Sequence, residues 1–217
     1  MIASSTMVAQ IVCVSPIQSF SDTKKMSTGD FSANVLFQDI NLTEHAIGYG
    51  PGKNKHYEVS ILDGKIYMAR PGQDGTTIVR HVPKADDGAA MLQVADVSKW
   101  GEYKVLDEIE SNDALNFELD DMVEESGCAS NLVLPFKIIG RAASVTWSMD
   151  TDNHRVDTKK EQNIVIEGIY TTKEKSKYFM VKGTNTHMHV ILTDEDLAGH
   201  LQKIVLKEGA KLYLPVK

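Results

Sequence analysis

The sequence predicts an α+β fold that is predominantly β, with mixed sheets curled toward a barrel and one or two helices. Short runs rich in β-branched and aromatic residues recur between Gly, Asp and Asn turn signals along most of the chain. One segment alone has a long helical spacing of apolar residues. Many strands beside few helices favour this class over bundles and alternating α/β folds.

The clearest hairpin in the first half joins strands 56–62 and 65–70 through Asp63-Gly64, a dipeptide typical of two-residue hairpin turns. A strand at 76–82 follows a Gly-rich turn at 72–75. The remaining elements are a strand or short helix at 34–42, a loop at 48–55, and a strand or short helix at 89–97.

The best helix spans residues 111–126, where Ser111 or Asn112 can cap the start and Gly127 can end it. Its apolar residues share one face: Leu115, Leu119, Met122 and Val123. Strands dominate the rest, with a hydrophilic connection expected at 150–161. They are predicted at 132–139, 142–149, 162–170, 178–192 and 201–214.

Composition limits the partners. The net charge is −7 with 42% hydrophobic and 24% charged residues, so the chain offers no basic stripe for nucleic acid or an anionic membrane. No apolar run reaches the roughly 18 residues of a membrane span. We therefore expect a small-molecule partner, with neither nucleic acid nor membrane as a ligand.

The organisation expected is a flexible or processed extension at 1–24, followed by one metal-binding domain at 25–217. The apolar stretch 7–14 lacks the basic residues that precede a secretory signal core. A cytoplasmic location is expected, with an exported form as the alternative. Nothing in the spacing of Cys13 and Cys128, the two cysteines, demands that they pair.

The sharpest chemical motif is His187-Met188-His189, followed eleven residues later by His200. Two histidines at alternate positions of a strand project from one face, and a turn at 193–196 would bring His200 back beside them. Three neutral imidazoles fit a tetrahedral zinc site with an open fourth position. The alternative from the residues alone is a polar strand face that carries imidazoles.

Several segments resemble motifs of the bacterial α-acetolactate decarboxylases. Residues 57–67 (YEVSILDGKIY) resemble that family's "GE-x-x-x-x-DG-x-x-Y" strand, and 45–50 (HAIGYG) and 135–140 (PFKIIG) are similar to its "hGdfGiGtf" and "yAikidG" segments. The histidines match its zinc-ligand spacing, with a glycine directly before His200. The resemblance runs from about Phe31 to Pro215 in this order.

The resemblance implies a Zn²⁺ enzyme, a carbon–carbon lyase of acetoin biosynthesis that converts α-acetolactate to acetoin and carbon dioxide. It implies His187, His189 and His200 as metal ligands and Glu58 as the acid/base. The substrate would be a small 2-hydroxy-3-keto acid, and the assembly a homodimer. Such a reaction leaves an enediolate, so charge must be stabilised before carbon is protonated.

Two departures bear on the reaction. The family's arginine, eight residues after the glycine matched by Gly140, is replaced by Ser148, and the chain stops at Lys217, before the segment that carries a second glutamate in the family. Arg141 is the candidate substitute. However, an odd separation from Ser148 places the two on opposite strand faces unless a bulge intervenes.

Three other readings stay open. The zinc hairpin could serve a repurposed or non-catalytic member of the fold, or an enzyme for another small oxo-acid. A cupin-type metalloenzyme, which also uses His-x-His, would take Glu195 as a ligand and favour iron or manganese. The spacing of Glu195 from His189 fits that pattern poorly.

Overall fold

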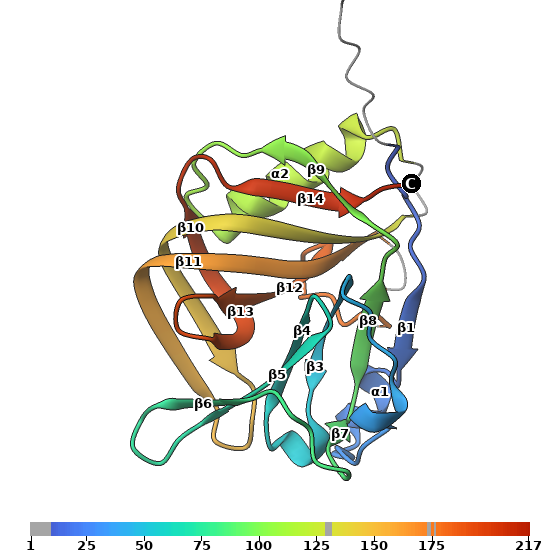
Figure 1. Cartoon of the computed structure of the whole chain (residues 1–217), viewed down its shortest axis with the longest axis vertical. Helices are drawn as coiled ribbons and strands as arrows, with labels where there is room; N and C mark the ends of the chain where they lie inside the picture. Colours follow the sequence, from blue (N-terminus) through green and yellow to red (C-terminus); the bar gives the residue numbers. More distant parts are fainter. Residues whose placement is uncertain (1–9, 129–131, 173–174, 176) are drawn as a thin grey trace, which may run out of the picture.

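The computed structural model describes residues 10–128, 132–172, 175 and 177–217. Two six-stranded sheets pack against each other, and the helices lie outside them (Figure 1). The predominantly β, α+β class is confirmed. Pairings between the named strands are all antiparallel rather than mixed, and among the described residues the two sheets do not close together into a barrel.

The first sheet has the order β1 (Ile17–Phe20), β8 (Leu92–Asp96), β3 (Ala46–Pro51), β4 (Glu58–Leu62), β5 (Lys65–Pro71) and β6 (Thr77–Arg80). The β4–β5 hairpin is the predicted one. Asp63 and Gly64 both have positive φ, 49° and 74°, which is the backbone of a type I′ turn. The ambiguous segments resolve as β8 and three short elements: β2 (Val35–Leu36), β7 (Gly88–Ala89) and the 3₁₀ helix η1 (Phe37–Asp39).

The second sheet has the order β11 (Arg155–Thr171), β12 (Thr186–Leu192), β13 (Leu197–Leu206), β10 (Val133–Met149), β14 (Lys211–Pro215) and β9 (Trp100–Val105). It curls until β11 also pairs with β10. Most of the hydrophilic stretch expected as a connection is strand: residues 155–160 pair with the outer half of β10. The side chains of this part of β11 are exposed or half-buried, so polar residues there stay in contact with water and lose little hydration.

Strand β12 is shorter than the predicted strand 178–192. Residues 178–185 form a turn with Phe179 at φ +59° and Gly183 at φ +89°, because Gly and Asn in this stretch favour reversal of the chain. The turn folds back beside β12. This return brings the Phe179 carbonyl to His187.

Helix α2 (Asn112–Glu125) confirms the predicted helix. The Ser111 hydroxyl accepts a hydrogen bond from Ala114 N, so Ser111 is the N-cap, and Gly127 follows the end at φ +67°. The predicted apolar face packs on the second sheet, where Leu115, Leu119 and Met122 are buried. A shorter helix, α1 (Thr23–Ser27), lies between β1 and β2 in the chain.

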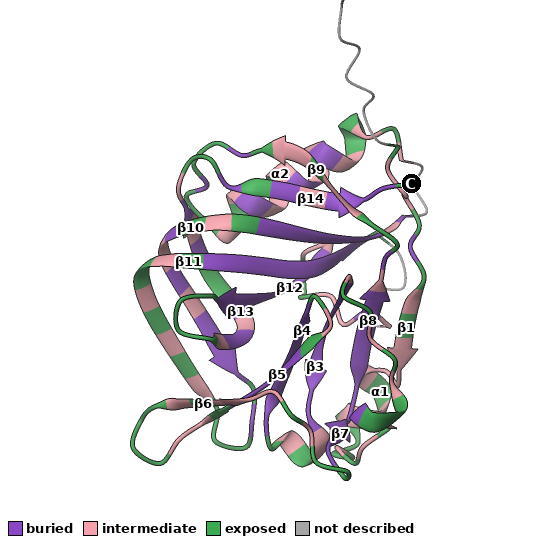
Figure 2. Cartoon of the chain, viewed as in Figure 1, coloured by how far each residue is buried: buried purple, intermediate pink, exposed green. Residues whose placement is uncertain are grey.

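The space between the sheets is divided into two parts. One part is apolar and joins the sheets through Ile47, Leu62, Tyr67, Ala95, Val165, Ile191 and Ala198. The other part is polar and carries the histidines. Figure 2 shows that the strands facing this interior, β3, β4 and β12 among them, are buried along most of their length.

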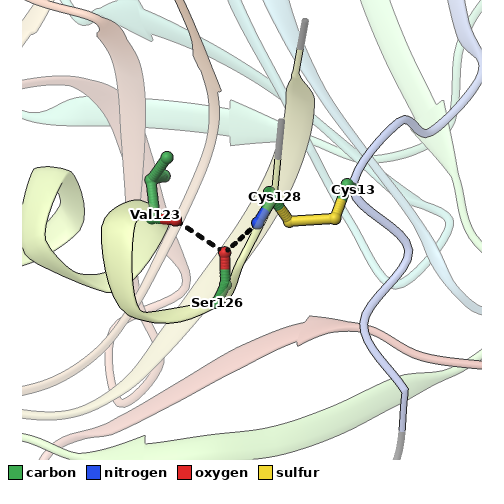
Figure 3. The surroundings of a disulfide bond; sticks show 4 residues. All are labelled: Cys13, Val123, Ser126 and Cys128. Carbon is green, nitrogen blue, oxygen red and sulfur yellow. Dashed lines mark hydrogen bonds between the residues drawn. A yellow bond between two sulfur atoms is a disulfide. The ribbon is translucent and has the colours of Figure 1, made fainter. Parts of the chain in front are cut away.

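Residues 10–20, which belong to the extension expected at 1–24, lie against both sheets. Ile11 and Val14 form bridges to the second sheet, and β1 pairs with β8 in the first, so the segment contacts both sheets. Cys13 forms a disulfide with Cys128 at the end of the α2 region (Figure 3). Residues 1–9 lie outside the described part of the chain. Among the described residues, no helix is both long and apolar enough to cross a membrane.

Candidate metal centre

The three histidines meet between the sheets. His187 and His189 alternate along β12 with Met188 and Val190, which belong to the core under α2, so both imidazoles face the first sheet. The predicted hairpin forms, and His200 on β13 lies directly opposite His189. The ring centroids are 4.5 Å apart for His187 and His200, and 5.3 and 5.5 Å for the other two pairs.

Close packing of β13 explains the glycine before the third histidine. A Cβ at Gly199 would lie 2.5 Å from the Ser148 carbonyl oxygen and 2.7 Å from the Trp147 ring. Only glycine lets β13 approach β10 this closely. The approach sets His200 directly across from Ser148, the position where the resemblance implies an arginine.

An oxygen atom lies within hydrogen-bond distance of Nδ1 in each of the three imidazoles. His187 Nδ1 lies 2.6 Å from the Phe179 carbonyl, and His200 Nδ1 lies 3.2 Å from Asp150 Oδ2. Because a carbonyl and a carboxylate only accept, these Nδ1 atoms donate, and in the neutral rings Nε2 carries the lone pair. His189 Nδ1 lies 2.7 Å from Ser60 Oγ on β4. Oxygen partners at the far nitrogen are typical of metal-binding histidines.

The Nε2 atoms are the nitrogens whose lone pairs could bind a metal. Those of His187 and His189 are buried and have no hydrogen-bond partner among the described residues. Burial, followed by the nearby His200, lowers the pKa of His187 well below its usual value, and burial lowers that of His189 likewise. Both rings are therefore neutral, the form that binds a metal.

The three imidazoles are the donor type of a zinc site, although no group of three or more His, Cys, Asp or Glu side chains in the described part of the chain is placed so that it could hold an ion. The imidazole planes are inclined by only 14° to 29° to one another, so the rings stack. The Nε2 atoms of His187 and His189 are buried without a hydrogen-bond partner among the described residues, so an ion bound there would displace no hydrogen bond from them.

Glu58 lies beside the histidines. Its Oε1 is 3.7 Å from His189 Nε2, and its Oε2 accepts a hydrogen bond of 3.0 Å from Asp150 N. Burial, followed by the negative charge of Asp150, raises the pKa of Glu58 well above its usual value. His56 is exposed. It lies directly after the 3₁₀ turn η2 (Lys53–Lys55) and before β4, which begins at Glu58.

A cavity of about 200 Å³ opens onto this group. This volume is below the range for drug-sized ligands, so it fits a small substrate. Its wall is largely apolar and carries two carboxyl groups, two of the histidines and one lysine. The lining residues are Met26, Phe31, Pro51, Lys55, Glu58, Asp150, Phe179, His187 and His200.

Arg141 is not part of this group. Its guanidinium is half exposed and pairs with Glu161, 3.1 Å away. Seven residues of β10 separate it from Ser148, roughly 20 Å of extended chain. Glu195 is also remote: it lies in the β12–β13 turn and forms an ion pair with Lys159.

Five residues of the site were not expected from the sequence. Tyr49 stacks on His187 with a centroid distance of 4.1 Å, and Glu167, wholly buried, lies directly opposite His189 on β11. Both Glu167 oxygens lack a partner among the described residues. The others are Asp150, Phe179 and Lys55. Strand alternation could have indicated Tyr49 and Glu167, but the remaining three lie in turns, which have no periodicity.

Comparisons with known proteins agree with this architecture. No family model and no curated protein sequence matches the chain. The structure is similar to α-acetolactate decarboxylase from Bacillus subtilis strain 168, with a TM-score of 0.72, 16% identity and coverage of 93% of this chain and 85% of that one. The enzyme from Bacillus subtilis subspecies spizizenii is similar with a TM-score of 0.72 and 15% identity. The match covers 93% of this chain and 86% of that one.

A Staphylococcus aureus protein of unknown function, described as similar to α-acetolactate decarboxylase, gives a TM-score of 0.68 at 14% identity, covering 91% of this chain and 84% of that one. The likeness extends over nearly the whole chain, while the identity is low. The chain therefore has the α-acetolactate decarboxylase fold.

Proposed function

We propose that this protein is a zinc-dependent lyase that decarboxylates a small 2-hydroxy-3-keto acid, α-acetolactate, to acetoin and carbon dioxide. The observation that carries the proposal is the pair of buried, unpartnered Nε2 atoms of His187 and His189 beside Glu58. The fold of the similar solved enzymes supports it.

His187, His189 and His200 would hold the metal. Three imidazole ligands and an open fourth position are the donor set of catalytic zinc. When bound, zinc would supply a Lewis acid that polarises the hydroxyl and carbonyl oxygens of the substrate.

Glu58 is proposed as the proton donor. When carbon dioxide leaves, the electron pair of the broken carbon–carbon bond passes into the neighbouring carbonyl, and carbon must then take a proton. Burial raises the pKa of the Glu58 carboxyl, which favours the protonated form that can give that proton. The Asp150 N–H holds Oε2, which leaves Oε1 toward the histidines.

Acetoin formation tests the proposal. Protein loaded with Zn²⁺ should convert α-acetolactate to acetoin faster than the chelator-treated protein and the buffer blank, and Glu58→Gln should fall close to the blank. Equal acetoin in all four samples would contradict the proposal.

Replacement of the family's arginine by Ser148 supports a second candidate, in which the same cavity acts on another small oxo-acid. The test is a panel of 2-hydroxy-3-keto and 2-keto acids, assayed for release of carbon dioxide. A turnover of one such acid that exceeds the turnover of α-acetolactate would favour this candidate. A homodimer stays a prediction.

We infer an oxidising compartment for the protein, in contrast to the cytoplasmic location expected from the sequence. Structural disulfides persist mainly in exported proteins, and Cys13–Cys128 is such a bond. Thiol counting of the protein isolated from its native cells, alkylated before lysis, tests this: two free thiols per chain would contradict it.

A further inference from the structure

The histidine cavity has one cationic side chain. Of the described residues that line it, only Lys55 is a lysine or arginine, while Glu58 and Asp150 are carboxyl groups. Asp150 Oδ2 accepts a hydrogen bond of 3.2 Å from His200 Nδ1, so Asp150 already has His200 as its partner. Lys55 has no such partner: within the described chain, no carboxylate lies within ion-pair distance of its ammonium group.

The backbone holds Lys55 in an uncommon conformation. Asn54 and Lys55 have φ of 55° and 54°, and two successive left-handed residues without glycine store strain. Hydrogen bonds hold this turn: Asn54 N donates to the Phe31 carbonyl at 2.7 Å, and Asp152 N donates to the Lys55 carbonyl at 3.2 Å. Strain retained in this way is common where a side chain must be aimed at a ligand.

The ammonium group lies over an aromatic ring that lines the histidine cavity. Lys55 Nζ lies 4.3 Å from the centroid of the Phe31 ring. Lys55 also lines a larger neighbouring cavity of about 550 Å³, but Phe31 lines only the histidine cavity. An aromatic face attracts a cation weakly and leaves its three N–H donors available for an anion.

We infer that Lys55 binds the substrate carboxylate and so supplies the positive charge for which the chain has no arginine at position 148. The inference rests on the proposed function, because it is the acid group of the substrate that Lys55 would hold. Met26, Phe31, Pro51 and Phe179 provide the apolar wall for the alkyl part of such an acid. Lys55 is thus a substrate-binding residue that orients the carboxyl group before its bond to carbon breaks.

Neither Arg141 nor Lys53 can supply this charge to the cavity. Arg141 is paired with Glu161 on the surface, and Lys53, two residues before Lys55, pairs with Asp86. Lys53 lines neither cavity. It is therefore a matched control: its removal takes the same charge from the same turn.

The experiment compares an acid with its amide. Zn²⁺-loaded wild type, Lys55→Met, Lys55→Arg and Lys53→Met are titrated by calorimetry with 2,3-dihydroxy-2-methylbutanoate and with the corresponding primary amide. Since a charge-assisted hydrogen bond is lost, Lys55→Met should bind the acid about 10- to 100-fold more weakly. It should bind the amide as wild type does. Lys55→Arg should recover most of the affinity for the acid, and Lys53→Met should behave as wild type.

Kinetics provide a second readout. Lys55→Met should raise KM for α-acetolactate, and Lys55→Gln, which keeps a long polar side chain, should do the same. Zinc content and circular dichroism of each variant report whether the fold and the metal centre survive; if Lys55→Met does not fold, Lys55→Gln takes its place in the titrations.

The outcomes separate the two proposals. If wild type makes acetoin and Lys55→Met keeps wild-type KM and acid affinity, Lys55 is not the carboxylate-binding residue, while the proposed function stands. If wild type binds neither compound and makes no acetoin, the proposed function fails, and the inference about Lys55 fails with it. Equal weakening for acid and amide would also overturn the inference, because it would show loss of shape rather than of charge.

Discussion

Ser60 Oγ and His189 Nδ1, on facing sheets, lie 2.7 Å apart, and this buried contact joins β4 to the candidate metal centre. The contact fixes the rotation of the His189 ring and so directs Nε2 toward Glu58. We predict that Ser60→Ala lowers zinc affinity about 10- to 100-fold, as loss of an orienting partner does at other metal-binding histidines. Competition with a chromophoric chelator measures the affinity. Ser19→Ala, in the same sheet, is the control, and an unchanged affinity for Ser60→Ala would refute the prediction.

Metal binding itself is tested at His189. We expect near-stoichiometric zinc in protein purified without added metal, and its loss in His189→Ala, because three donors are the minimum of a catalytic zinc site. Elemental analysis gives the content directly. His45→Ala, which removes a histidine remote from the centre, should retain zinc. Full zinc in His189→Ala would remove this histidine from the ligand set.

Glu58→Gln separates proton donation from metal binding. The amide keeps the shape of the side chain but cannot give its proton to carbon, so acetoin formation should fall about 10²- to 10⁴-fold. Zinc content should stay at the wild-type level, since Glu58 is not among the proposed ligands. Glu44→Gln on the surface is the matched control. A variant with wild-type turnover would exclude Glu58 as the donor.

Glu167 gives a prediction about stability and pH. Burial raises its pKa in the folded chain well above the unfolded value. Between the two pKa values the folded state binds more protons than the unfolded state, so the free energy of unfolding declines as pH rises, by at most about 1.4 kcal/mol per pH unit. Glu167→Gln cannot ionise, so its free energy of unfolding should rise relative to that of wild type from pH 5 to pH 8. Urea unfolding of the metal-free proteins measures the difference in the free energy of unfolding, and Glu108→Gln at an exposed position is the control. A difference between Glu167→Gln and wild type that is independent of pH would contradict the account.

The disulfide should matter for stability because it links residues 115 positions apart. Constraint of the unfolded chain by such a bond is worth about 2–5 kcal/mol. It also fastens the segment that contacts both sheets, and Ser126 Oγ holds the turn beside it by donating to the Val123 carbonyl and accepting from Cys128 N (Figure 3). Cys13→Ser with Cys128→Ser should therefore unfold at lower urea concentration. Reduction of the wild type should have the same effect, and equal midpoints would refute the role.

Local patterns alone determined the predicted parts that the structure confirms. The Asp63-Gly64 hairpin, the capped helix α2 and the return of His200 beside His189 depend on turn chemistry and on alternation within a few residues. Such signals act over short distances, and the sequence contains them completely. For the same reason the pair His187 and His189 could be assigned to one strand face.

Tertiary structure decided what lies opposite those residues. Ser60, Asp150 and Phe179 reach the three Nδ1 atoms from other strands and from turns, and no spacing in the sequence relates them to the histidines. Lys55 enters the cavity through two left-handed residues, a backbone state with no periodic signature. The sheet-to-sheet packing that joins these groups comes from burial of apolar surface, which is non-directional, so only the folded chain specifies which polar side chains meet.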